Sequence, residues 1–188
     1  RAVTPAPIRL LEETDSTNAE ARRLAEAGES GPLWIVARRQ TAGRGRRGRE
    51  WIDQSGNLSA TLLTTLRRSP AEAAQLTFVA ALAVADLVAD HLRGDVTAVP
   101  TIEAAASALA RTFAVWMARW ETLGFQPVLD AWAARAPGLD GPAVARLGHE
   151  TVSGRAEGLD PDGALRLRLA VGGLRLISAG DVFFGEAV

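Results

Sequence analysis

The spacing of apolar and polar positions predicts a chain of mixed α and β structure. Short apolar stretches rich in Leu, Val, Ile and Trp predict three strands, over 8–12, 33–39 and 57–66. Apolar residues at helical spacing predict four helices, over 17–27, 70–92, 101–123 and 126–135. Glycines end the first and third of these helices, at Gly28 and Gly124. Glycine, arginine and polar residues dominate 40–56, which is therefore predicted to be a long loop.

The pattern changes after residue 141. Between 143 and 184, short alternating stretches are separated by turn signals such as Asp160-Pro161-Asp162-Gly163 and Gly172-Gly173. This spacing predicts a small antiparallel sheet or barrel of about five strands. A domain boundary is therefore predicted near Gly141, giving domains 1–141 and 142–188, and the fold class is α+β.

The amino-acid composition argues against several kinds of functional site. The 188-residue chain has a net charge of -1, no cysteine and two histidines, which argues against disulfides, thiolate chemistry and a structural zinc site. No uninterrupted apolar run reaches the roughly 18 residues of a membrane span, and no signal-peptide layout opens the chain, so a cytoplasmic location is expected. The sequence contains no lysine, so it offers no catalytic side-chain amine.

The strongest motif is a basic glycine loop, Gly43-Arg44-Gly45-Arg46-Arg47-Gly48-Arg49-Glu50-Trp51. Backbone amides and arginine side chains together suit a bound polyphosphate. Because the loop has few apolar anchors to offset the entropy of ordering it, we expect a ligand to order it. Its glycine spacing matches a dinucleotide-binding pattern, but the residues that follow are poor helix formers, so a Rossmann site is not expected. Two other interpretations remain: a solvated basic loop, and a loop that contacts nucleic acid. No second basic cluster supports the nucleic-acid interpretation.

Polar residues at two element ends are further candidates. Asp15, Ser16 and Thr17 are all good helix caps, and Thr17-x-x-Glu20 fits a capping box. The alternative is that this helix N-terminus faces a small ligand. Gln40 ends an apolar strand, where its carboxamide either caps the strand or binds a ligand.

Taken together, these motifs resemble biotin protein ligase. The likeness covers about 8–92 and is carried by Thr14-Asp15-Ser16-Thr17-Asn18, by Gln40-Thr41-Ala42-Gly43-Arg44-Gly45-Arg46-Arg47-Gly48-Arg49-Glu50-Trp51 and by Gly56-Asn57-Leu58. It implies a mixed-sheet catalytic domain with flanking helices and a small C-terminal SH3-like β domain, in the class without an N-terminal DNA-binding domain.

The resemblance also implies an activity. Such an enzyme makes biotinyl-adenylate from biotin and ATP, with Mg²⁺, and passes biotin to a lysine of a biotin carboxyl carrier protein domain. Neither a nucleic-acid nor a membrane partner is expected, and a homodimer is left open. By position, the biotin pocket would comprise Ser16, Thr17, Asn18, Gln40, Gly43, Arg44, Gly45 and Arg46. The adenylate loop would comprise Arg44, Arg46, Arg49 and Trp51, with Trp51 anchoring its far end, and no metal ligand is assigned.

The chain departs from the family after the long helix. The family continues there with a strand carrying Lys-Trp-Pro-Asn-Asp and with further central strands, whereas this chain passes almost directly from Val96 to Pro100 and a helix. No catalytic residue is therefore identifiable. One hypothesis is that the polypeptide contains a central segment near 96–100 that the 188 residues omit. Another is a remnant that binds biotin or its adenylate without turnover. A lipoate-type ligase also stays open, although the arginine-rich glycine loop favours biotin.

Overall fold

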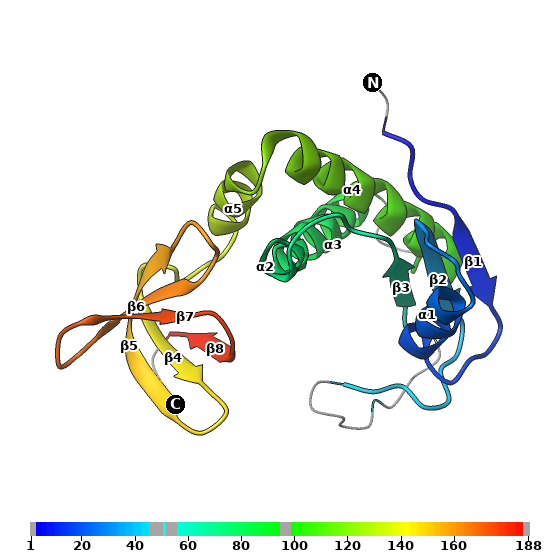
Figure 1. The fold of residues 1–188 in the computed structure, drawn as a ribbon. Coiled ribbons are helices and arrows are strands. Elements are labelled where there is room, and N and C mark those ends of the chain that lie inside the picture. Colours follow the sequence, from blue (N-terminus) through cyan, green and yellow to red (C-terminus); the bar gives the residue numbers. More distant parts are fainter. Residues whose placement is uncertain (1–2, 46–50, 52–55, 95–98, 186–188) are drawn as a thin grey trace. The chain divides into compact units, whose positions relative to one another are not determined.

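The computed structural model describes residues 3–45, 51, 56–94 and 99–185 (Figure 1). The chain folds into two compact units. The first comprises Arg1–Ala73 with Ala80–Ala118, and the second comprises Ala74–Val79 with Arg119–Val188. The boundary predicted near Gly141 remains a prediction.

The first unit is built on a three-stranded mixed sheet in the order β1-β2-β3. Strand β1 (Ile8–Leu11) runs parallel to β2 (Leu33–Ala37), and β2 runs antiparallel to β3 (Ser59–Leu63). All three strands lie where the apolar runs predict them, although each observed strand is shorter than its predicted range. Together with the antiparallel sheet of the second unit, this mixed sheet confirms the predicted α+β class.

Both faces of β2 are covered, and the sequence of this strand explains how. Leu33 and Ile35 pack with Ala21 of α1 (Thr17–Glu26) on one face. Trp34 points to the other face and meets Phe113 of α4 (Ile102–Leu123) edge-on, with ring centroids 5.4 Å apart. A strand buried on both faces reads as a continuous apolar run rather than an alternating one. All five residues of β2 are buried.

The prediction of a single helix over 70–92 is wrong in one respect, because the structure has two helices there. These are α2 (Pro70–Ala74) and α3 (Leu76–Arg93). The Thr77 hydroxyl donates to the Ala74 carbonyl at 2.9 Å, and the Phe78 N–H donates to the Gln75 carbonyl, three residues back, at 3.0 Å. The Phe78 backbone bond spans three residues instead of the four of a regular α-helix, which marks the break near Gln75.

The second unit contains α5 (Gln126–Ala133) and a five-stranded antiparallel sheet in the order β7-β6-β5-β4-β8. Its strands are β4 (Pro142–Arg146), β5 (Thr151–Leu159), β6 (Leu165–Leu169), β7 (Leu174–Ile177) and β8 (Asp181–Phe184). Small and branched side chains fill its core: Ala143, Ala145, Ala156, Leu165, Leu167 and Ile177. The predicted small antiparallel sheet of about five strands is confirmed.

One stretch in the described part of the chain, Pro70–Arg93, is long and apolar enough to cross a membrane by length and composition. Its most apolar window has a mean hydropathy of 1.6, and only 17% of that window is buried. Much of the apolar surface of α3 therefore lies open or half-buried.

Candidate functional site

The predicted site lies where β1 and β2 end. The parallel pairing continues past both strands, because Thr14 bridges Gln40. The Thr14 N–H donates to the Arg39 carbonyl at 3.1 Å, and the Thr41 N–H donates to the Thr14 carbonyl at 2.9 Å. Carboxyl ends of neighbouring parallel strands share one edge of a sheet, the usual place for a ligand. This pairing sets the start of α1 beside Gln40, although the two are far apart in the sequence.

Thr17 and Gln40 form the centre of the site. The Gln40 side-chain oxygen Oε1 accepts from the Thr17 N–H at 2.8 Å and from the Thr17 hydroxyl at 3.1 Å. Thr17 is 4% exposed and is the one buried polar residue in the part of the chain that the structure describes. The first N–H groups of a helix have no partner within the helix, so Gln40 supplies one that the fold requires.

Thr61 joins this network from the middle of β3. Its hydroxyl lies 2.9 Å from the Thr17 hydroxyl and 3.1 Å from Asn18 Oδ1, and its single proton can go to either oxygen. Sequence reasoning missed Thr61 as a site residue. The only signal was a hydroxyl within an apolar strand, which β propensity explains equally well.

The predicted helix caps need correction. Ser16 occupies the N-cap position with extended backbone, but its side chain makes no capping hydrogen bond. The capping box of Thr17 with Glu20 is wrong, because Thr17 is the first helical residue and its hydroxyl bonds to Gln40 instead. Glu20 accepts from Arg23 Nε at 2.9 Å.

Asp15 and Arg23 brace the turn that leads into α1. Arg23 donates to both Asp15 carboxylate oxygens, at 2.7 and 2.9 Å. The Ser16 N–H donates to Asp15 Oδ1 at 2.8 Å. The Arg23 hydrogen bond, followed by that of Ser16, holds the pKa of Asp15 well below its ordinary value of 3.8. Bonds to Asp15 and then to Glu20 raise the pKa of Arg23. These groups are exposed, so they contribute more to geometry than to overall stability.

Gly43 and Trp51 bring the two ends of the basic loop together. The Trp51 N–H donates to the Gly43 carbonyl at 3.0 Å. Gly43 is buried, and a Cβ there would lie 3.2 Å from Gln40 Nε2 and 3.3 Å from the Trp51 carbonyl oxygen. A side chain at residue 43 would therefore press on the Gln40 amide. The Trp51 side chain itself is 57% exposed.

The structure thus gathers Thr17, Asn18, Gln40 and Gly43 of the predicted pocket and adds Thr61. Ser16 adjoins them through its backbone, Arg44 is exposed and Gly45 is half-buried. Arg46 and Arg49 lie outside the described residues, as does most of the loop that we expect a ligand to order. The assignment of phosphate binding to these arginines remains a prediction.

Comparison with known proteins gives the family. A model of the biotin/lipoate A/B protein ligase family matches residues 10–107, and a model of the biotin protein ligase C-terminal domain matches residues 144–185. A biotin–[acetyl-CoA-carboxylase] ligase of Paracoccus denitrificans is 35% identical over 241 residues. That alignment covers 94% of this chain and 100% of the relative.

Solved structures show the same fold. Biotin protein ligase from Aquifex aeolicus, in complex with biotin and ATP, matches with a TM-score of 0.77 at 18% identity, over 95% of this chain and 99% of that one. Biotin acetyl coenzyme A carboxylase synthetase from Helicobacter pylori, with bound biotinylated ATP, matches with a TM-score of 0.60 at 17% identity, over 90% and 99% of the two chains. These structures show the fold, and the family models together with the Paracoccus relative establish that the chain belongs to the biotin/lipoate A/B protein ligase family.

Proposed function

We propose that the protein is a biotin–carrier-protein ligase. The observation that supports this most directly is the part-buried network of Thr17, Gln40 and Thr61 beside the ends of β1 and β2, with the closed base of the basic loop next to it. The Paracoccus relative is named as a ligase for biotin and acetyl-CoA carboxylase. The lysine acceptor proposed for this chain therefore lies on the biotin carrier part of such a carboxylase.

The network fits the head of biotin. The ureido ring of biotin is neutral and presents one carbonyl acceptor and two N–H donors, so it needs fixed, neutral partners of both kinds. Amide and hydroxyl groups of Asn18, Gln40 and Thr61 provide these, and none of them carries a charge. Because Gln40 fixes Thr17, and Thr61 bonds to Thr17 or Asn18, the partners are oriented before the ligand arrives.

The loop serves the other end of biotin, where the reaction takes place. In the first step, the biotin carboxylate attacks the α-phosphorus of MgATP, an acyl–phosphate bond forms and pyrophosphate leaves. In the second step, a lysine amine of the carrier attacks the acyl carbon, an amide bond forms and AMP leaves. We assign Arg44 and the further arginines of the loop to the negative charge on the phosphate. To the loop as a whole, once a ligand orders it, we assign the protection of the adenylate from water.

The test is an adenylation assay. The purified chain is incubated with MgATP and biotin, and pyrophosphate and biotinyl-adenylate are measured, with lipoate as the competing substrate. We expect product from biotin and none from lipoate. When a carrier domain is added, we expect biotin to be transferred to it. Product from lipoate alone would assign the chain to the lipoate branch of the family.

A second function is favoured by one observation, the complete lack of lysine in the 188 residues. A chain that binds biotin or biotinyl-adenylate without making it would need the pocket but no amine from the protein. In the same assay, this chain would retain added biotinyl-adenylate and release no pyrophosphate from MgATP and biotin.

A further inference from the structure

Arg23 of α1 is 50% exposed, yet two carboxylates hold its guanidinium group. It donates to both carboxylate oxygens of Asp15, at 2.7 and 2.9 Å. It also donates to Glu20 Oε2 from Nε at 2.9 Å and from Nη2 at 2.7 Å. A single surface ion pair contributes little to stability, whereas a two-pronged arginine–carboxylate pair within a network holds a defined geometry. Arg23 therefore fixes the position of the Asp15 carboxylate.

Asp15 connects Arg23 to the base of the basic loop. While its side chain bonds to Arg23, its backbone carbonyl accepts from the Ala42 N–H at 2.8 Å. Ala42 directly precedes Gly43, whose carbonyl accepts from the Trp51 N–H at 3.0 Å. A displacement of Asp15 would therefore reach the point at which the two ends of the loop meet.

The network around Thr17 has its own support. Thr17 is held by direct bonds with Gln40 and Thr61, and Arg23 takes no part in these bonds. The two ends of the proposed site are thus supported separately, the ureido end by Gln40 and Thr61 and the loop end by Asp15.

We propose that Arg23 is a positioning residue for the basic loop. Through Asp15 it sets the place of Ala42 and Gly43, and with them the start of the arginine-rich segment assigned to the phosphate. This role rests on the proposed function. Because the ureido end is supported separately, the loss of Arg23 acts mainly at the phosphate end of the ligand.

The first test needs no ligand. Arg23→Met keeps a long side chain and removes the guanidinium group. In this variant the Ala42 amide should exchange with solvent at least about fivefold faster, while exchange of the Thr17 amide changes by less than about twofold. Arg23→Lys retains the charge without the two-pronged donor, so its Ala42 exchange should lie in between. Unchanged exchange of the Ala42 amide in Arg23→Met would overturn the role.

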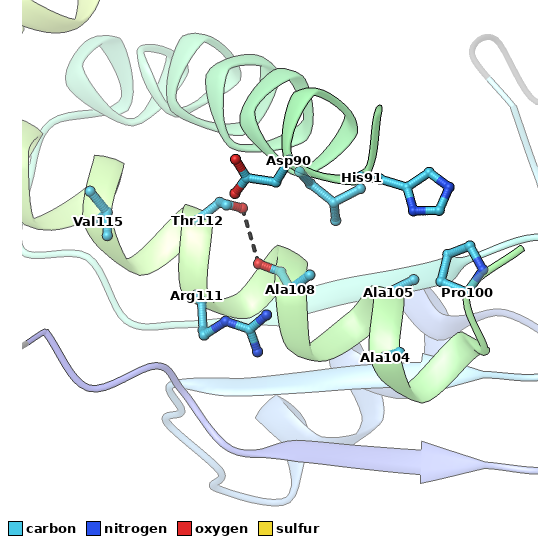
Figure 2. Close-up of a pocket in the computed structure, with 10 residues that line it drawn as sticks. Asp90, His91, Pro100, Ala104, Ala105, Ala108, Arg111, Thr112 and Val115 are labelled. Carbon is cyan, nitrogen blue, oxygen red and sulfur yellow. Dashed lines mark hydrogen bonds between the residues drawn. The ribbon is translucent and has the colours of Figure 1, made fainter. Parts of the chain in front are cut away.

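Arg111 provides a matched control, because it is an exposed arginine of the same unit. It lines a cavity of about 310 Å³ between α3 and α4, together with small residues such as Ala104 and Ala108 (Figure 2). Arg111→Met removes the same positive charge and leaves the bonds that join Arg23 to Asp15 in place. It therefore separates an effect of position from an effect of net charge.

The second test is a calorimetric titration of the unmodified chain, Arg23→Met and Arg111→Met with biotin and, separately, with biotinyl-adenylate. Arg23→Met should bind biotinyl-adenylate at least about fivefold more weakly and biotin less than about twofold more weakly, and Arg111→Met should change neither affinity by more than about twofold. Equal weakening of both ligands by Arg23→Met, or equal effects of the two variants, would overturn the role. Binding of neither ligand by the unmodified chain would contradict the proposed function, and the exchange of the Ala42 amide would still decide whether Arg23 positions the loop.

A double-mutant cycle tests the route through Asp15. Asp15→Asn and Arg23→Met should each weaken biotinyl-adenylate binding about fivefold, and the double variant should also weaken it about fivefold. All three variants should keep a thermal midpoint within about 3 °C of that of the unmodified chain, because the pair is exposed. A loss of about 25-fold in the double variant would show that the two residues act independently and would overturn the route through Asp15.

Discussion

At the scale of single residues, one buried hydroxyl organises the site. The Thr17 hydroxyl has two hydrogen-bond partners, the Gln40 amide oxygen and the Thr61 hydroxyl. Burying a polar group without a partner is costly, so each of these contacts supports both the fold and the shape of the pocket. The sequence motifs indicate Thr17 and Gln40. Thr61 could not be found in the same way, because its contact with Thr17 joins residues 44 positions apart.

Replacing Thr61 tests this network. Thr61→Val keeps the shape of the side chain and removes the hydroxyl, so about 1 kcal/mol of stability should be lost. The thermal midpoint should fall by roughly 2–4 °C, and biotin affinity by about three- to tenfold. Thr61→Ser retains the hydroxyl and should keep most of the affinity. Unchanged biotin binding in Thr61→Val would remove Thr61 from the site.

The ion pair of Asp15 with Arg23 predicts a pH dependence at the start of α1. The folded pKa of Asp15 lies below its ordinary value of 3.8, so the pair stabilises the protein above about pH 4. That stability is lost as the pH falls through the lowered pKa. NMR titration of the Asp15 carboxyl carbon should give a midpoint below 3.8. A midpoint at or above that value would contradict the pairing, and Asp15→Asn should remove this part of the pH dependence.

At the scale of elements, the apolar runs predicted the strands well because burial on both faces leaves a plain signal in β2. Helix ends were predicted less well. The break at Gln75 lies in a stretch with no internal glycine or proline to indicate it. The start of α1 depends on Gln40, which a local capping pattern does not include.

The base of the basic loop gives a prediction at this scale. Gly43→Ala places a methyl group about 3.2 Å from Gln40 Nε2, so the amide must shift by a few tenths of an ångström. Biotin affinity should fall about three- to tenfold, equivalent to about 1 kcal/mol, in a calorimetric titration. Gly148→Ala is the control, since a Cβ there meets nothing within 4 Å. If the two variants bind biotin equally, Gly43 does not set the position of Gln40.

At the scale of the whole molecule, two family models match separate parts of the chain, the ligase model over 10–107 and the C-terminal domain model over 144–185. The fold class and the ligase family could be predicted from the sequence because dense glycine and arginine motifs are specific. The exposure of Val84, Val88 and Leu92 on α3 could not, since an apolar helix has the same sequence pattern whether or not a neighbour covers it. The 188 residues thus hold the hydrogen-bonded network on which the proposed biotin site is built.

The most direct test of the central claim is a calorimetric titration with biotin of three proteins: the unmodified chain, Gln40→Leu and Gln126→Leu. Gln40→Leu removes the acceptor of two hydrogen bonds from Thr17, whereas Gln126 bonds to Asp130 on the exposed side of α5. The unmodified chain should bind one biotin, Gln126→Leu should bind it equally well, and Gln40→Leu should bind it about 10- to 100-fold more weakly. No binding by the unmodified chain, or equal binding by Gln40→Leu, would contradict the assignment of the biotin site.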